Sequence, residues 1–206
     1  MSSKTKQIIA EAQEFLNRHS YDAAHDLEHH QQVWANVQQI IPTISAEIDL
    51  FALEIATMWH DAITGKKLIN RNKIKRQTAN FVARRMSELG FDRKTIVRTK
   101  TAILQHSSGD AQTIIESKIL ADADKLEWLS VGRLKKITQQ ITDGKFSKFK
   151  ILIYKYFFKK LFKRIHEKMH FEASQKMLTQ KINEFKNNPD VKKIAQKFNS
   201  KIEDYI

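Results

Sequence analysis

The sequence contains no cysteine among its 206 residues. This absence excludes disulfide bonds, thiolate metal ligands and a cysteine nucleophile, and it is typical of a protein from a reducing compartment. Any metal ion bound by this chain would therefore take its ligands from histidine, aspartate and glutamate.

Glycine and proline are also scarce, with five and two residues respectively. Because β-turns depend on these residue types, a sandwich or barrel of many short strands is difficult to build from this composition. Hydrophobic residues make up 41 % of the chain and charged residues 29 %, as in ordinary globular proteins. We therefore expect a single all-α domain spanning residues 1–206.

Long hydrophobic runs are missing as well. The N-terminal stretch MSSKTKQIIAEAQEFLNRH alternates charged and apolar residues and has neither the uninterrupted apolar segment of a signal peptide nor that of a membrane span. Together with the absence of cysteine, this favours a cytoplasmic protein.

Apolar residues recur every three or four positions, which predicts helices. Before residue 130 the expected segments reach from about residue 8 to 19, and then cover about 26–41, 49–60, 74–89, 96–106 and 114–129. Further helical patterning follows between residues 145 and 187. The segment 49–60 is apolar on nearly every side, which predicts a helix at the centre of the bundle. It would carry His60 and Asp61 into the interior.

Adjacent residues on a helix point about 100° apart, so His60 and Asp61 gain little by pairing with each other. Both can instead turn toward one ion. His29 and Asp124, on two other predicted helices, also lie in or beside apolar stripes. Two imidazoles and two carboxylates suit a divalent ion such as Mn²⁺, Fe²⁺, Co²⁺, Ni²⁺ or Mg²⁺, and a metal removes the cost of burying two unpaired carboxylates.

Three motifs carry these residues in the order His…His-Asp…Asp: HDLEHHQQV at 25–33, WHD at 59–61 and ILADADKL at 119–126. They resemble the HD superfamily of metal-dependent phosphohydrolases. AILQHS at 102–107, FKKL at 158–161 and MHFEA at 169–173 are similar to segments of small bacterial members of that superfamily. The resemblance covers roughly residues 20–187 and implies an HD-domain helical bundle with core motifs in 20–130 and C-terminal helices, 145–206, packed on it.

The resemblance implies the metal ligands His29, His60, Asp61 and Asp124. It also implies hydrolysis of a phosphate ester or anhydride by metal-activated water, with a nucleotide or pyrophosphate bond as the expected substrate. A cyclic-nucleotide or other phosphodiesterase is the alternative. Gln32 stands where an arginine is common in the family, which leaves substrate choice open.

Catalytic roles are expected for three residues. Asp61 is the candidate to bridge metals if a second ion binds. Lys125, beside Asp124, is the candidate to hold phosphate. His106 is a candidate second-metal ligand or proton donor to the leaving group, and a purely structural role for it stays open. Further candidates for substrate binding are Lys66, Arg71 and Arg76.

Other polar residues near the motifs have plainer interpretations. Asp122 lies about 200° around the helix from Asp124, so we expect it to be exposed or to cap a helix. Glu28 and His30 are expected at the surface or supporting the site. His25 and Asp26 are as consistent with a helix cap as with a catalytic role.

The chain carries a formal net charge of +13, and residues 145–168 contain nine lysines and arginines against one glutamate, interleaved with aromatic residues. Such a segment can bind nucleic acid or an anionic membrane without enzymatic activity. It can equally be a helix docked on the core by its aromatic residues, with solvated lysines. Both interpretations stay open.

Overall fold

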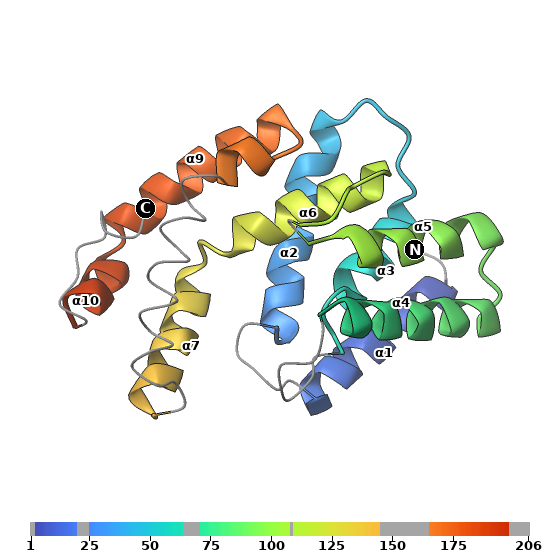
Figure 1. The fold of residues 1–206 in the computed structure, drawn as a ribbon, viewed down its shortest axis with the longest axis horizontal. Coiled ribbons are helices and arrows are strands. Elements are labelled where there is room, and N and C mark those ends of the chain that lie inside the picture. Colours follow the sequence, from blue (N-terminus) through green and yellow to red (C-terminus); the bar gives the residue numbers. More distant parts are fainter. Residues whose placement is uncertain (1–2, 20–24, 64–70, 108, 145–164, 198–206) are drawn as a thin grey trace. The chain divides into compact units, whose positions relative to one another are not determined.

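The computed structural model describes residues 3–19, 25–63, 71–107, 109–144 and 165–197 (Figure 1). Within these ranges all the regular secondary structure is helical, which confirms the predicted all-α class. The chain divides into two compact units, Met1–Asp124 and Lys125–Ile206. The single domain stays a prediction.

The first unit is a bundle built around one central helix. Its helices are α1 (Ser3–His19), α2 (Leu27–Ile40), α3 (Leu50–Trp59), α4 (Arg71–Glu88), α5 (Arg93–Gln105) and α6 (Ile115–Glu127), with a 3₁₀ turn, η1 (Ile41–Thr43), after α2. Helix α3 packs against α1, α2 and α5, and α4 lies beside α5 (Figure 1). Neighbours on several sides explain why α3 is apolar almost all round.

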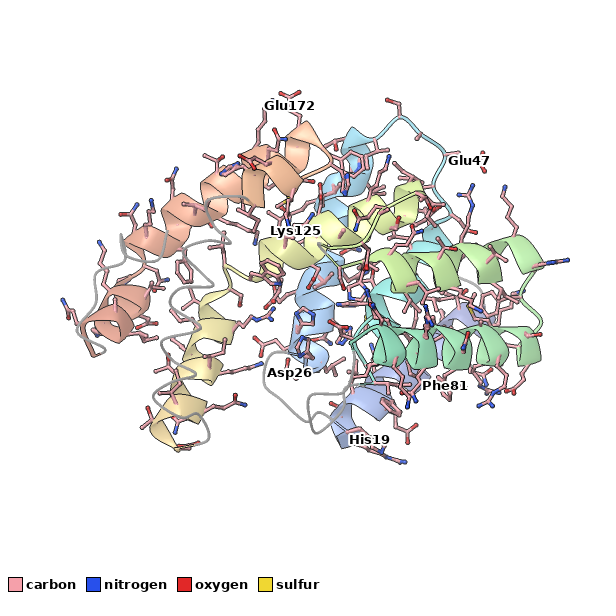
Figure 2. The ribbon with its side chains drawn as sticks, viewed as in Figure 1. His19, Asp26, Glu47, Phe81, Lys125 and Glu172 are labelled. Atoms are coloured by element: carbon pink, nitrogen blue, oxygen red, sulfur yellow. The ribbon has the colours of Figure 1, made fainter. Side chains whose placement is uncertain are left out.

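Three aspartates fix where helices of this unit begin. Asp26, Asp49 and Asp92 each accept a hydrogen bond from the backbone N–H three residues further on, at 2.9 or 3.0 Å. The cap at Asp26, which Figure 2 labels, confirms the helix-cap interpretation of that residue. Because Asp26 caps α2 through the backbone of His29, the cap places His29 in the first turn of that helix.

The end of α3 is held by Trp59. Its side chain is 1 % exposed, and its indole N–H donates to the carbonyl of Ile8 on α1 at 3.1 Å. Large buried aromatic side chains contribute several kcal/mol to folding, so replacing Trp59 by alanine would cost about 3–5 kcal/mol. This anchor fixes the position from which the chain presents His60 and Asp61.

The second unit begins within the last turn of α6 and is smaller. Its described helices are α7 (Val131–Thr142), the 3₁₀ turn η2 (His166–Lys168), α9 (Glu172–Asn187) and α10 (Pro189–Lys197). Val191 and Ala195 form its small buried cluster, against which Val131, Leu134 and Phe185 pack.

Candidate metal centre

The structure brings four predicted site residues from three helices together. His29 lies in the first turn of α2, His60 and Asp61 follow α3, and Asp124 lies in α6. The Nε2 atoms of His29 and His60 are 3.2 Å apart. Asp124 Oδ1 lies 3.6 Å from His29 Nε2 and 3.9 Å from His60 Nε2, and Asp61 Oδ2 lies 3.9 Å from His60 Nε2.

These separations fit ligands of a single divalent ion. Metal–nitrogen and metal–oxygen bonds of about 2.1 Å place adjacent octahedral ligands about 3.0 Å apart and opposite ligands about 4.2 Å apart. The four measured distances fall between these limits. The donor atoms of His29, His60 and Asp61 also lie within 4.8 Å of one another, which identifies them as a group that can hold a metal ion.

The carbonyl of Thr57 sets the tautomer of His60. His60 Nδ1 lies 2.8 Å from the Thr57 carbonyl oxygen, and a carbonyl can only accept, so Nδ1 carries the hydrogen. Burial lowers the pKa of His60 to about 4, because the charged ring is poorly solvated and the positive charge of His106 adds to this effect. The ring is therefore neutral at pH 7, and Nε2 presents a lone pair toward His29.

The contact between the two Nε2 atoms follows from this tautomer. At 3.2 Å the two nitrogens are within hydrogen-bond distance. Because His60 Nε2 is the acceptor, the hydrogen of that bond comes from His29 Nε2 when no cation is bound. A metal ion would replace this hydrogen and bind both lone pairs, as expected for a pair of histidine ligands.

Asp61 lies among histidines, with each of its oxygens facing a different ring. Oδ1 is 3.3 Å from His106 Nε2, and Oδ2 is 3.6 Å from His25 Nε2. Burial acts to raise the pKa of Asp61, but the charge and hydrogen bond of His106 outweigh it and hold the pKa well below its usual value. The carboxylate is thus ionised at neutral pH, as metal binding requires.

His106 is the cationic member of the cluster. Burial lowers its pKa, but the charge of Asp61 and the hydrogen bond to it prevail and raise the pKa to about 9. His106 Nδ1 donates to the carbonyl of Ile103 at 2.7 Å, which leaves the second N–H directed at Asp61. At neutral pH this ring can therefore supply a proton.

Burial decides between the expectations for two neighbouring polar residues. His30 is completely buried, which excludes the surface position and leaves the supporting role that was also expected. Asp122 is 0 % exposed inside α6, so the expectation of an exposed or capping carboxylate is wrong. Glu28 is exposed, as expected for a surface residue.

The structure describes only two of the four predicted substrate-binding side chains. The ammonium of Lys125, labelled on α6 in Figure 2, donates to the carbonyl of Lys168 at 2.6 Å, a contact within the second unit. Arg76 is exposed on α4. Lys66 and the side chain of Arg71 lie outside the described residues.

Most of the basic segment, residues 145–164, also lies outside the described residues. Its nucleic-acid and membrane interpretations therefore stay predictions. None of the described helices combines the length and the apolar character needed to cross a membrane.

His25 lies beside the candidate site, next to Asp61 and His29, which the sequence analysis did not predict. It lies four residues before His29 and one before the cap, and its ring approaches that of His29 edge-on, with centroids 5.7 Å apart. Because α2 begins at Leu27, His25 lies outside the helix, and its spacing of four residues from His29 gives no helical-face signal. The capping pattern of Asp26 had offered an equally good explanation of this dipeptide.

Comparison with known proteins adds no assignment: no family model, curated protein or solved structure matches the chain. The geometry and chemistry of the residues themselves carry the functional argument.

Proposed function

We propose that this chain is a divalent-metal-dependent phosphohydrolase of the HD superfamily, acting on a small phosphorylated substrate such as a nucleotide or a pyrophosphate. The supporting observation is the convergence of the Nε2 atoms of His29 and His60 with the carboxylates of Asp61 and Asp124, at 3.2–3.9 Å. Among reactions open to such a site, hydrolysis at phosphorus fits the resemblance of the three motifs.

His29 and His60 would hold a divalent ion as neutral ligands, and Asp61 and Asp124 would balance its charge. When bound there, the ion would supply Lewis acidity, which activates water and neutralises charge on the phosphoryl oxygens. Since Asp61 is ionised and lies partly exposed, with a quarter of its side chain accessible, it stands where the site meets solvent.

His106 is the proposed acid of the reaction. Its ring is cationic at neutral pH and its Nε2–H faces Asp61 Oδ1 at 3.3 Å. A leaving oxygen that approaches Asp61 can take this proton as the bond to phosphorus breaks. General acids positioned in this way typically accelerate reactions by about 10²–10⁴-fold.

The test is a turnover screen of the purified protein against nucleotides, pyrophosphate, simple phosphate monoesters and cyclic and linear diesters, with added Mn²⁺, Co²⁺ or Mg²⁺. We expect metal-dependent release of phosphate or pyrophosphate. Asp61→Asn should abolish it. Glu47→Gln makes the same chemical change at a side chain that is 84 % exposed, and should leave turnover unchanged.

Cleavage of diesters alone would replace this proposal by the phosphodiesterase alternative. An ion-free protein with no turnover, whose binding to DNA, RNA or anionic vesicles weakens steeply with salt, would contradict it and favour the non-enzymatic interpretation.

A further inference from the structure

His30 is fully buried on α2, directly after His29. Its Nδ1 lies 3.0 Å from the carbonyl oxygen of Thr57 on α3, and because a carbonyl can only accept, this nitrogen carries the hydrogen. Its other nitrogen, Nε2, is buried and has no hydrogen-bond partner among the residues that the structure describes. The bond to Thr57 is thus the feature that distinguishes this ring from an apolar core side chain.

The same carbonyl serves two histidines. Thr57 accepts from His30 Nδ1 at 3.0 Å and from His60 Nδ1 at 2.8 Å. A carbonyl oxygen has two lone pairs, so these two bonds use its full capacity. The His30 and His60 rings also lie side by side, with centroids 4.6 Å apart. One oxygen near the end of α3 therefore links the two helices that carry the imidazoles of the metal centre.

We propose that His30 is a positioning residue that sets the spacing between His29 and His60 by tying α2 to α3 through the Thr57 carbonyl. The inference rests on the metal site of the proposed function. His30 adjoins His29 in the first turn of α2, and Thr57 lies one turn before His60, so the bond joins the start of α2 to the end of α3 beside both candidate ligands. The 3.2 Å separation of the two Nε2 atoms is the quantity that it controls.

Packing alone is a poor account of this residue. A leucine of similar volume would fill the same space without burying an unpartnered nitrogen, which carries a desolvation cost of about 1–3 kcal/mol. The hydrogen bond from Nδ1 to the Thr57 carbonyl offsets the desolvation free energy of the buried His30 Nε2. Replacing a residue that orients a metal ligand without touching the ion typically lowers metal affinity by about 10–100-fold.

Three substitutions separate the bond from the volume. His30→Asn keeps an N–H donor near the Nδ1 position, His30→Gln moves the donor to the Nε2 position, and His30→Leu removes it. The measurement is Co²⁺ affinity of the full chain, followed by visible absorption. We expect His30→Asn to bind like the wild type, and His30→Gln and His30→Leu to bind about 10–100-fold more weakly, with altered ligand-field spectra.

A control separates positioning from stability. Thr99, on α5, is also fully buried and donates to the Thr95 carbonyl at 2.9 Å. Thr99→Val removes this hydroxyl at nearly constant volume, so it should lower the free energy of unfolding without changing the Co²⁺ affinity of the folded protein. A loss of affinity in the His30 variants beyond that of Thr99→Val assigns the effect to positioning.

Wild-type affinity in His30→Leu or His30→Gln would overturn the inference while leaving the proposed metal site intact. A wild-type protein that binds no Co²⁺ would overturn the proposed function, and this inference with it. If the variants do not fold, ¹⁵N spectra of the wild-type histidine rings still test the tie. Protonated Nδ1 and bare Nε2 are expected for His30, and the reverse assignment contradicts the inference.

Discussion

His29 and His60 face each other across α2 and α3, with Nε2 atoms 3.2 Å apart in the buried interior. The Thr57 carbonyl holds the hydrogen of His60 on Nδ1, so the Nε2 lone pair is directed at His29. With two carboxylates beside them, the two rings provide a set of ligands that an ion can join without rearrangement of their helices.

Metal binding is expected to stabilise the fold. A ligand at 100 times its Kd, bound only by the folded state, adds about 3 kcal/mol to the free energy of unfolding. Thermal unfolding with and without Mn²⁺ should therefore show a higher Tm with metal, and a chelator should reverse the shift. Asp124→Asn should abolish most of it. An equal shift in Asp124→Asn would place the ion elsewhere.

His106 is expected to matter for turnover more than for metal retention. His106→Asn keeps a donor toward the Ile103 carbonyl but loses the one that faces Asp61, so kcat should fall by about 10²–10⁴-fold with the ion still bound. Activity should also decline as pH rises and the ring loses its proton. The pKa of His106 is about 9 without a metal ion, and a bound cation lowers this pKa. The midpoint of the decline in activity should therefore lie at or below pH 9. A pH profile identical in wild type and His106→Asn would contradict the assignment.

Stability of the chelator-treated protein should be greatest near neutral pH. Burial lowers the pKa of His30 to about 3 and that of His60 to about 4, from 6.5 in the unfolded chain. Between about pH 4 and 6.5 the unfolded chain binds more protons, so the free energy of unfolding rises with pH, by up to about 1.4 kcal/mol per pH unit for each ring.

His106 acts in the opposite direction at alkaline pH. Its folded pKa of about 9 lies above the unfolded value of 6.5, so its stabilising contribution is complete below pH 6.5 and is lost as pH rises through 9. Urea unfolding at pH 5, 7 and 9 checks both directions. Equal stability at pH 5 and 7 would show that the buried rings are not held neutral.

Asn36 is expected to fix the position of Asp124 on α6 relative to α2. Its side chain is 3 % exposed on α2 and donates to the carbonyl of Ala123, the residue before Asp124, at 3.0 Å. Asn36→Asp removes the donor at constant volume and should cost about 1–3 kcal/mol of stability and weaken Mn²⁺ binding. Calorimetric titration measures the second effect. Asn36→Asp with unchanged metal affinity would leave Asn36 a role in stability alone.

Lys75 and Asp110 are expected to stabilise the loop after His106. The Lys75 ammonium contacts both Asp110 oxygens, at 2.6 and 2.8 Å, and Asp110 also accepts from the backbone N–H of Ser107 at 3.1 Å. Because Lys75 is 7 % exposed and Asp110 more accessible, Lys75→Met should cost about 2 kcal/mol, between the values for surface and buried pairs. A double-mutant cycle with Asp110→Asn measures the coupling, and zero coupling would contradict the role.

Local rules predicted the parts of the fold that depend on nearby residues. The apolar stretch of α3 lies at the centre of the first unit, and Asp26 caps α2, which is one of the two roles expected for it. The four candidate ligand positions came from the resemblance of the three motifs to the HD superfamily, together with the apolar residues around each of them. Their convergence in space is a tertiary property that the motifs only imply.

Burial of polar residues could not be predicted in the same way. Aspartate and histidine are residue types usually found at the surface, and Asp122 and His30 are buried only because other helices pack around them. Helix α7 includes a glycine, Gly132, as its second residue. A glycine near a helix N-terminus costs about 1 kcal/mol, and the cap of Ser130, whose side chain accepts from the Arg133 N–H, offsets it.

The most direct test of the metal centre is anomalous diffraction from crystals of the protein grown with Mn²⁺. We expect one peak within about 2.0–2.3 Å of His29 Nε2, His60 Nε2 and oxygens of Asp61 and Asp124. A peak bound to other residues, or well-ordered crystals in which these four side chains surround no ion at saturating Mn²⁺, would contradict the account.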